Sequence, residues 1–256
     1  MLKPALFVSA LALLALPAAA EPIQWPAGKK AAIVLTYDDA MTSQLDNAIP
    51  QLDKAGLKGT FFLNMKAPTD LLRWRTVSRN GHELGNHTET HPCPLSILPG
   101  RPNATDTYTE ARILGEIAIM NSALNAIDGP KPRTLAYPCA QTLVGGQDYR
   151  DALRRSGLVK YARNGGNLDA SIITDATAID LLSIPASGST DSAELIAHVK
   201  RVEEAGGLSI LVFHGVGGEY LSVSAQAHQE LVDYLRNDPD IWVGTFQDVM
   251  DYVTKR

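Results

Sequence analysis

Cysteine is scarce in this chain of 256 residues, with only two, Cys93 and Cys139. Two cysteines exclude a disulfide-rich scaffold, in which several bridges replace a hydrophobic core. A chain of this length can instead bury one large core. Basic residues are also in the minority, since 23 Lys and Arg stand against 28 Asp and Glu and the net charge is −5. We therefore expect neither nucleic acid nor anionic lipid as a partner.

The first 20 residues lack the length of a transmembrane helix but have the parts of a secretory signal. Lys3 provides the positive charge, an apolar stretch covers 5–16, and small residues at 18–20 form an A-x-A cleavage site. We expect residues 1–20 to be a signal peptide and residues 21–256 to form a single catalytic domain. The mature protein is then periplasmic or extracellular, with no membrane insertion.

Apolar runs alternate with helical patterns along the rest of the chain. Strands are expected at 31–37, 59–64, 82–87, 133–138, 158–163, 180–186, 208–214 and 241–246. Helices are expected near 43–55, 69–80, 106–127, 148–156, 192–205, 225–236 and 247–254. This alternation predicts an α/β fold of parallel strands covered by helices. Seven or eight such units suit a distorted (β/α) barrel, and a doubly wound open sheet is the alternative.

Polar residues that can do chemistry stand where the expected strands end. Asp38 and Asp39 follow the first strand, His87 ends the third, His91 lies four residues further on, and His214 ends the seventh. Barrel enzymes build their active sites at this carboxyl-terminal rim. Adjacent carboxylates are costly to bury unless a cation or hydrogen bonds compensate, although they can also cap a helix.

Two imidazoles and one carboxylate are the ligand set of a hydrolytic metal site with open positions. The second carboxylate is then free to take a proton from a metal-bound water. A histidine delivered by an apolar strand, as His214 is, suits a general acid, and a buried structural histidine is the alternative.

The chain resembles the polysaccharide deacetylases, carbohydrate esterase family 4, over essentially the whole mature sequence. The resemblance lies in three motifs, which are Thr36-Tyr37-Asp38-Asp39, His87-Thr88-Glu89-Thr90-His91 and Leu211-Val212-Phe213-His214. It implies a divalent metal ion, usually Zn²⁺, held by Asp39, His87 and His91. It also implies that Asp38 is the general base and His214 the general acid. The implied reaction removes acetyl groups from a glycan such as chitooligosaccharide, peptidoglycan or acetylated xylan.

The third motif of the family is altered in this chain. Many members carry an Arg that orients the base and then a tyrosine whose backbone N–H stabilises the oxyanion. Ala136 and Cys139 stand at those two positions. A backbone N–H survives a change of side chain, so Cys139 remains the expected oxyanion donor. Arg163 of the next strand is the candidate to replace the missing Arg, or else it is an ordinary residue of the rim.

The fourth motif of the family, an Asp-Trp pair, has no counterpart here. The partner of His214 is therefore open, with Asp175 and Asp180 as candidates. A catalytically silent glycan-binding module and a metal-independent amide hydrolase on the same fold are the alternative functions. Both N-acetyl and O-acetyl substrates fit the motifs, and the oligomeric state is left open.

The two cysteines follow neighbouring strands. Cys93 lies two residues after His91, and Cys139 lies at the end of the fourth strand. Consecutive strands of a barrel are usually adjacent, so their rim loops meet. We predict a disulfide between Cys93 and Cys139, with two unpaired thiols as the alternative.

Overall fold

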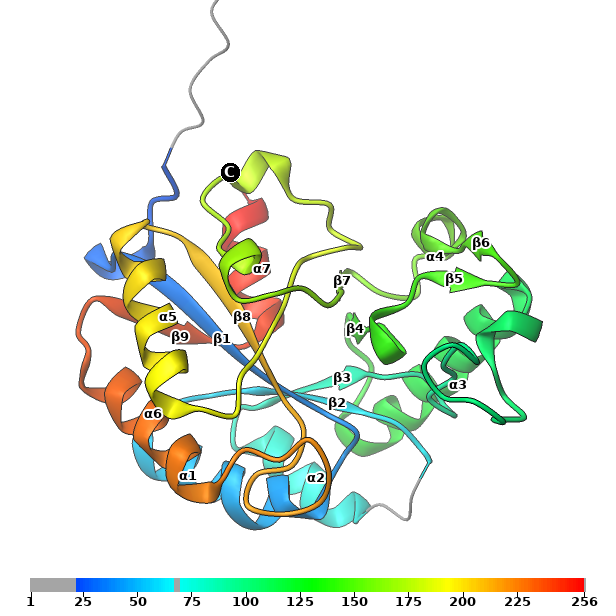
Figure 1. The fold of residues 1–256 in the computed structure, drawn as a ribbon, viewed down its shortest axis with the longest axis horizontal. Coiled ribbons are helices and arrows are strands. Elements are labelled where there is room, and N and C mark those ends of the chain that lie inside the picture. The colour runs from blue at the N-terminus through cyan, green and yellow to red at the C-terminus, as the bar shows by residue number, and fades with distance from the viewer. Residues whose placement is uncertain (1–21, 67–69, 256) are drawn as a thin grey trace, which may run out of the picture.

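The computed structural model describes residues 22–66 and 70–255 (Figure 1). The expected signal peptide, residues 1–20, lies outside these described residues. None of the described helices combines the length and the apolar character that crossing a bilayer requires.

Seven parallel strands form one curled sheet in the order β7-β4-β3-β2-β1-β8, and β9 pairs with the first half of β1. The strands are β1 (Ala31–Asp38), β2 (Thr60–Leu63), β3 (Glu83–Asn86), β4 (Thr134–Ala136), β7 (Tyr161–Arg163), β8 (Leu208–Phe213) and β9 (Ile241–Gly244). A short antiparallel hairpin, β5 (Leu143–Val144) and β6 (Gln147–Asp148), lies apart from this sheet. The prediction of a distorted (β/α) barrel in one domain is confirmed.

Helices follow the strands as expected and cover the sheet. They are α1 (Ile49–Ala55), α2 (Leu71–Arg79), α3 (Glu110–Asp128), α4 (Arg150–Ser156), α5 (Ser192–Glu204), α6 (Ala225–Asn237) and α7 (Phe246–Thr254). A π-helical turn, Gln44–Ala48, leads into α1. Figure 1 shows α5 and α6 side by side next to β8 and β9, with α1 and α2 further along the same layer.

The barrel is distorted because one predicted strand is irregular. The sequence predicts a regular strand at 180–186, between β7 and β8, but this part of the chain makes only isolated parallel bridges. One joins Ile184 to Arg163, and the other, just after the segment, joins Ser187 to Leu211. Pro185 lies between these two bridges and has no N–H to donate, which explains why the ladder is interrupted. The segment still joins the two edge strands of the curled sheet.

Alternate residues of β1 face two different layers. Ile33, Leu35 and Tyr37 belong to the core beneath the outer helices, whereas Ala32 and Val34 belong to the core inside the barrel. All eight residues of β1 are buried, as expected for a parallel strand covered on both faces. Helix α7 contributes its buried apolar face to the inner core.

Candidate active site

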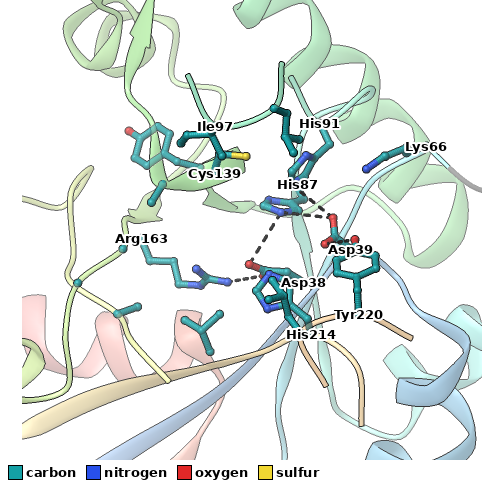
Figure 2. Close-up of a pocket in the computed structure, with 18 of the residues that line it drawn as sticks. Asp38, Asp39, Lys66, His87, His91, Ile97, Cys139, Arg163, His214 and Tyr220 are labelled. Carbon is teal, nitrogen blue, oxygen red and sulfur yellow. Dashed lines mark hydrogen bonds and ion pairs between the residues drawn. The ribbon is translucent and has the colours of Figure 1, made fainter. Parts of the chain in front are cut away.

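One pocket at the carboxyl-terminal rim of the barrel brings together the expected metal ligands, the general base, the general acid, Cys139 and Arg163. Its volume is about 560 Å³. The predicted residues that line it are Asp38, Asp39, His87, His91, Cys139, Arg163 and His214. They come from five segments that are far apart in the sequence and point toward a common centre (Figure 2).

The two-residue period of the strands delivers several of these side chains to the barrel interior. Asp38 continues the inward-facing positions of β1, which include Val34. Arg163 shares the inward parity of Tyr161 on β7, and His214 follows that of Ile210 on β8. The buried apolar strands therefore fix where these polar side chains point.

Asp39, His87 and His91 form a compact group of potential metal ligands. Their donor atoms all lie within 4.8 Å of one another. The Nε2 atoms of His87 and His91 are 3.8 Å and 3.5 Å from Asp39 Oδ1. The two imidazole rings are 4.6 Å apart at an interplanar angle of 73°. All three donors thus face one small volume.

The second nitrogen of each imidazole is occupied outside this volume. His87 Nδ1 donates to the backbone carbonyl of Ala136 at 2.8 Å, which leaves the lone pair on Nε2. His91 Nδ1 lies 3.6 Å from Cys93 Sγ, an acceptor because this sulfur carries no proton in a disulfide. Burial and the neighbouring His87 lower the pKa of His91 to about 4 despite the attraction of Asp39. Two oriented imidazoles and a carboxylate are donors that fit a divalent ion such as zinc.

Asp39 is held on both of its carboxylate oxygens. Asn64 Nδ2 donates to Oδ1 at 2.8 Å, and the hydroxyl of Tyr220 donates to Oδ2 at 2.6 Å. The backbone of Asp39 is left-handed, with φ +77°. Burial raises the pKa of its carboxyl, but the two histidines and the Tyr220 hydrogen bond outweigh burial, so the pKa is lowered. A costly backbone conformation that is over-determined by contacts is typical of a functional position.

The loop between His87 and His91 turns back on itself without forming a helix. Thr88 and His91 both have positive φ, +61° and +52°. Buried Glu116 of α3 anchors the loop by accepting hydrogen bonds from Thr90, one from the backbone N–H and one from the hydroxyl. This turn brings the two imidazoles together over a short stretch of chain.

Asp38 is paired with Arg163 inside the barrel. The guanidinium Nη2 donates to Asp38 Oδ1, and both residues are at most 5% exposed. Burial alone raises the pKa of the Asp38 carboxyl, but attraction by Arg163, His87 and His214 outweighs it and holds the pKa at about 2. Asp38 is therefore an ionised carboxylate at neutral pH.

Arg163 lies where the family's third-motif Arg would be needed. It is directly paired with Ala136 in the register of β4 and β7. Ala136 is small and fully buried, so the guanidinium can pass from the neighbouring strand to Asp38. The face of the Phe62 ring supports it, with the guanidinium carbon 4.8 Å from the ring centroid.

His214 lies beside the two aspartates, and the proposed alternative partners lie elsewhere. Asp175 accepts hydrogen bonds from Thr177, and Asp180 pairs with Arg150 and Arg154 around a separate pocket. Neither carboxylate contacts His214 in the described part of the chain. Burial, together with His87 and Arg163, lowers the pKa of His214 despite the attraction of Asp38 and Asp39.

The predicted disulfide between Cys93 and Cys139 is confirmed. The two Cα atoms are 5.7 Å apart. The bridge joins the loop that follows His91 to the turn Pro138–Ala140, whose central residue, Cys139, has φ +53°. It thereby ties the loop that carries His91 to the segment that carries the Cys139 backbone N–H.

Tyr220 is a site residue that sequence reasoning missed. It lies in the loop after His214, and Glu219 attaches this loop to the segment just after Asp39. The Glu219 carboxylate accepts from the backbone N–H groups of Thr42 and Ser43 at 2.9 Å and 3.2 Å. The loop thus depends on a contact between residues about 175 positions apart, which no local pattern reveals.

Comparison with known proteins agrees with this geometry. The sequence model for polysaccharide deacetylases matches residues 26–159, just over half of the chain. A curated relative, a gellan lyase from Bacillus sp., is 26% identical over 254 residues. The match covers 93% of this chain but only 10% of that protein, so the chain spans about a tenth of its relative's length.

Solved structures share the fold at low sequence identity. A protein assigned as a polysaccharide deacetylase from Mycobacterium smegmatis has a TM-score of 0.67 at 19% identity, with 92% of this chain and 94% of that chain covered. The Xyl-CE4 domain of a multidomain xylanase from the hindgut metagenome of Trinervitermes trinervoides gives 0.58 at 18%, with coverage of 86% and 90%. The catalytic domain of a peptidoglycan N-acetylglucosamine deacetylase from Eubacterium rectale gives 0.55 at 19%, with coverage of 90% and 94%. Because the sequence model matches more than half of the chain, the chain belongs to the polysaccharide deacetylase family.

Proposed function

We propose that this protein is an exported, metal-dependent carbohydrate deacetylase that hydrolyses acetyl groups on a glycan. The observation that carries the proposal is the convergence of two groups in one pocket. One is the Asp39, His87 and His91 donor set, and the other is the ion pair of Asp38 with Arg163. Family membership supports hydrolysis of an acetylated glycan.

Asp39, His87 and His91 are the residues that would hold the divalent ion, which the donor set suggests is zinc. When bound, such an ion polarises a carbonyl oxygen and makes water more acidic. The chain itself supplies the oriented imidazoles and a fixed carboxylate. Asn64 and Tyr220 keep that carboxylate turned toward the histidines.

Asp38 is proposed as the general base. Its carboxylate is ionised, and Arg163 fixes one oxygen, so the other oxygen is left to accept a proton from the attacking water. The water oxygen then bonds to the acetyl carbonyl carbon. The backbone N–H of Cys139 is proposed to donate a hydrogen bond to the carbonyl oxygen as negative charge develops there.

His214 is proposed to protonate the leaving group. The bond from the acetyl carbon to nitrogen or oxygen breaks, and the sugar amine or alcohol takes a proton from the imidazolium. The lowered pKa of His214 makes its protonated form a stronger acid but a less populated one at neutral pH. Acetate and the deacetylated sugar are the products.

Both N-acetyl and O-acetyl bonds suit this arrangement, since the same attack cleaves either. Export to the periplasm or the extracellular space is supported by the expected signal at residues 1–20. The Cys93–Cys139 disulfide also suits an oxidising compartment.

Acetate release from a panel of N-acetylated and O-acetylated glycans tests the proposal. We expect turnover on at least one glycan, its loss after chelation, and its return with zinc or cobalt. Binding of a glycan without acetate release would favour a silent binding module. Full turnover in metal-free protein would favour a metal-independent hydrolase.

A further inference from the structure

The active-site pocket has more cations than carboxylates, although the whole chain has a net negative charge. The chain has a net charge of −5, yet three cations, Lys66, Arg101 and Arg163, line the pocket with only two carboxylates, Asp38 and Asp39. The Arg163 charge is balanced by Asp38, and Asp39 faces the two histidines. Lys66 and Arg101 are left without an ion-pair partner among the described residues.

Lys66 is attached to the metal-ligand group through its backbone. Its N–H donates to Asn64 Oδ1 at 3.1 Å, while the amide group of the same Asn64 donates to Asp39. The preceding residue, Met65, donates its N–H to the carbonyl of Glu89 in the ligand loop at 2.9 Å. Figure 2 shows the amino end of Lys66 turned toward His91. This cation therefore lies beside the reacting centre.

Arg101 reaches the pocket from the loop that follows His91. This loop is fixed at one end by the Cys93–Cys139 disulfide and at the other by Asn103, whose side chain donates to the Thr90 carbonyl at 3.1 Å. The Arg101 side chain is partly buried. Two anchored loops thus each bring one unpaired cation to the same pocket.

Apolar side chains line the remaining mouth of the pocket. Leu221 is 68% exposed and Tyr220 is 50% exposed, and both line the pocket with Ile97 and Leu98. Such surfaces suit the C–H faces of a sugar ring, and the cations suit an anionic substituent on it. An acidic protein would repel a polyanion without local positive charge, so cations in the pocket favour anionic ligands.

We propose that the substrate is an acidic glycan that carries carboxylates, and that Lys66 and Arg101 form a carboxylate subsite. The carboxylate belongs to the acetylated sugar or to the sugar next to it. A guanidinium can bind a carboxylate through two parallel hydrogen bonds, and an ammonium adds a point charge. This inference rests on the proposed deacetylase function.

The test compares two substrates that differ only in charge. One is an acetylated oligosaccharide that contains glucuronic acid, and the other is the same compound after its carboxyl groups are reduced to alcohols. We expect the full chain to have the higher kcat/KM on the acidic substrate, mainly through a lower KM. In the double variant Lys66→Gln/Arg101→Gln, the ratio of the two kcat/KM values should fall about tenfold, as expected for two partly exposed ion pairs. Raising the salt to about 0.5 M should reduce the ratio for the unmodified protein, since exposed charges are screened.

A matched control removes the same two charge types elsewhere. Lys54 and Arg79 are exposed in the last turns of α1 and α2, which lead to the amino-terminal ends of β2 and β3, opposite the pocket. Lys54→Gln/Arg79→Gln should keep the preference for the acidic substrate. Equal kcat/KM on both substrates, or a preference that survives the Lys66/Arg101 double variant, would overturn the carboxylate subsite and leave the deacetylase function standing. Absence of turnover on both substrates and on the wider glycan panel would overturn both.

Discussion

Arg163→Met removes the cation that holds Asp38 ionised inside the barrel. Breaking a buried ion pair from one side typically costs about 3–5 kcal/mol, because the remaining charge has lost its compensation. Part of this free-energy cost can be worked out from the pKa of the Asp38 carboxyl. A pKa lowered from 3.8 to about 2 corresponds to about 2 kcal/mol of stability at neutral pH. We expect the free energy of unfolding of the variant at pH 7 to be about 3–5 kcal/mol lower.

The sign of the pH dependence follows from the lowered pKa of Asp38. The unmodified protein has the full stabilisation from this carboxylate above its unfolded pKa of 3.8 and loses it as the pH falls toward about 2. In the variant, only His87 and His214 still oppose burial, so the pKa of Asp38 should be higher than in the unmodified protein, and the variant should lose less stability as the pH falls. The stability gap between the two proteins should therefore be widest near neutral pH and narrow toward about pH 3.

Urea unfolding in the presence of a chelator measures this gap across the pH range. The double variant Arg163→Met/Asp38→Asn is the control, because it also removes the stranded charge and should recover part of the stability. The variant should also lose turnover, since Arg163 no longer holds the Asp38 carboxylate in place. If Arg163→Met unfolds within about 0.5 kcal/mol of the unmodified protein at pH 7, Arg163 does not compensate the Asp38 charge.

Three further changes probe the surroundings of the site. Gly85→Ala would place a Cβ 2.4 Å from the Phe62 ring, so we expect a loss of about 1–3 kcal/mol in urea unfolding and a lower kcat. Reducing the disulfide should lower stability by about 2–4 kcal/mol and lower turnover, as followed by thiol titration, thermal unfolding and acetate release. Tyr220→Phe removes the hydrogen bond to Asp39 and should weaken metal affinity about tenfold in a chelator competition.

One outcome would contradict each of these three predictions. Unchanged stability of Gly85→Ala would mean that the Phe62 ring moves freely. Full turnover of the reduced protein would mean that the bridge does not hold the site. Unchanged metal affinity of Tyr220→Phe would mean that Asn64 alone orients Asp39.

The order of strands and helices could be predicted because the pattern is local. The continuous apolar run of β1 indicates a strand buried on both faces, and its two-residue period determines that Asp38 points into the barrel. The closing segment 180–186 was harder to predict, since its apolar residues resemble a strand while Pro185 prevents a continuous ladder. The local sequence pattern thus predicts where a strand lies better than it predicts whether the strand forms a continuous ladder.

Within the site, residues in motifs could be predicted and residues held by distant contacts could not. Arg163 was a candidate from its place on the strand after Ala136, but its contact with Asp38 depends on the β4–β7 register. The position of Tyr220 depends on its loop, which Glu219 attaches to Thr42, a residue far away in the sequence. The sequence leaves the partner of His214 open, with Asp175 and Asp180 as candidates. The structure instead pairs Asp175 with Thr177, and Asp180 with Arg150 and Arg154.

The different roles of the two adjacent aspartates give the most direct test of this account. Metal content and acetate release are measured together for the unmodified protein, Asp38→Asn and Asp39→Asn. We expect about one divalent ion per chain in the unmodified protein, with activity lost on chelation and restored by zinc. Asp38→Asn should keep the ion and lose about 10²–10⁴-fold in kcat, whereas Asp39→Asn should lose both the ion and the rate. Loss of the ion from Asp38→Asn to the same extent as from Asp39→Asn, or full activity in metal-free protein, would contradict the account.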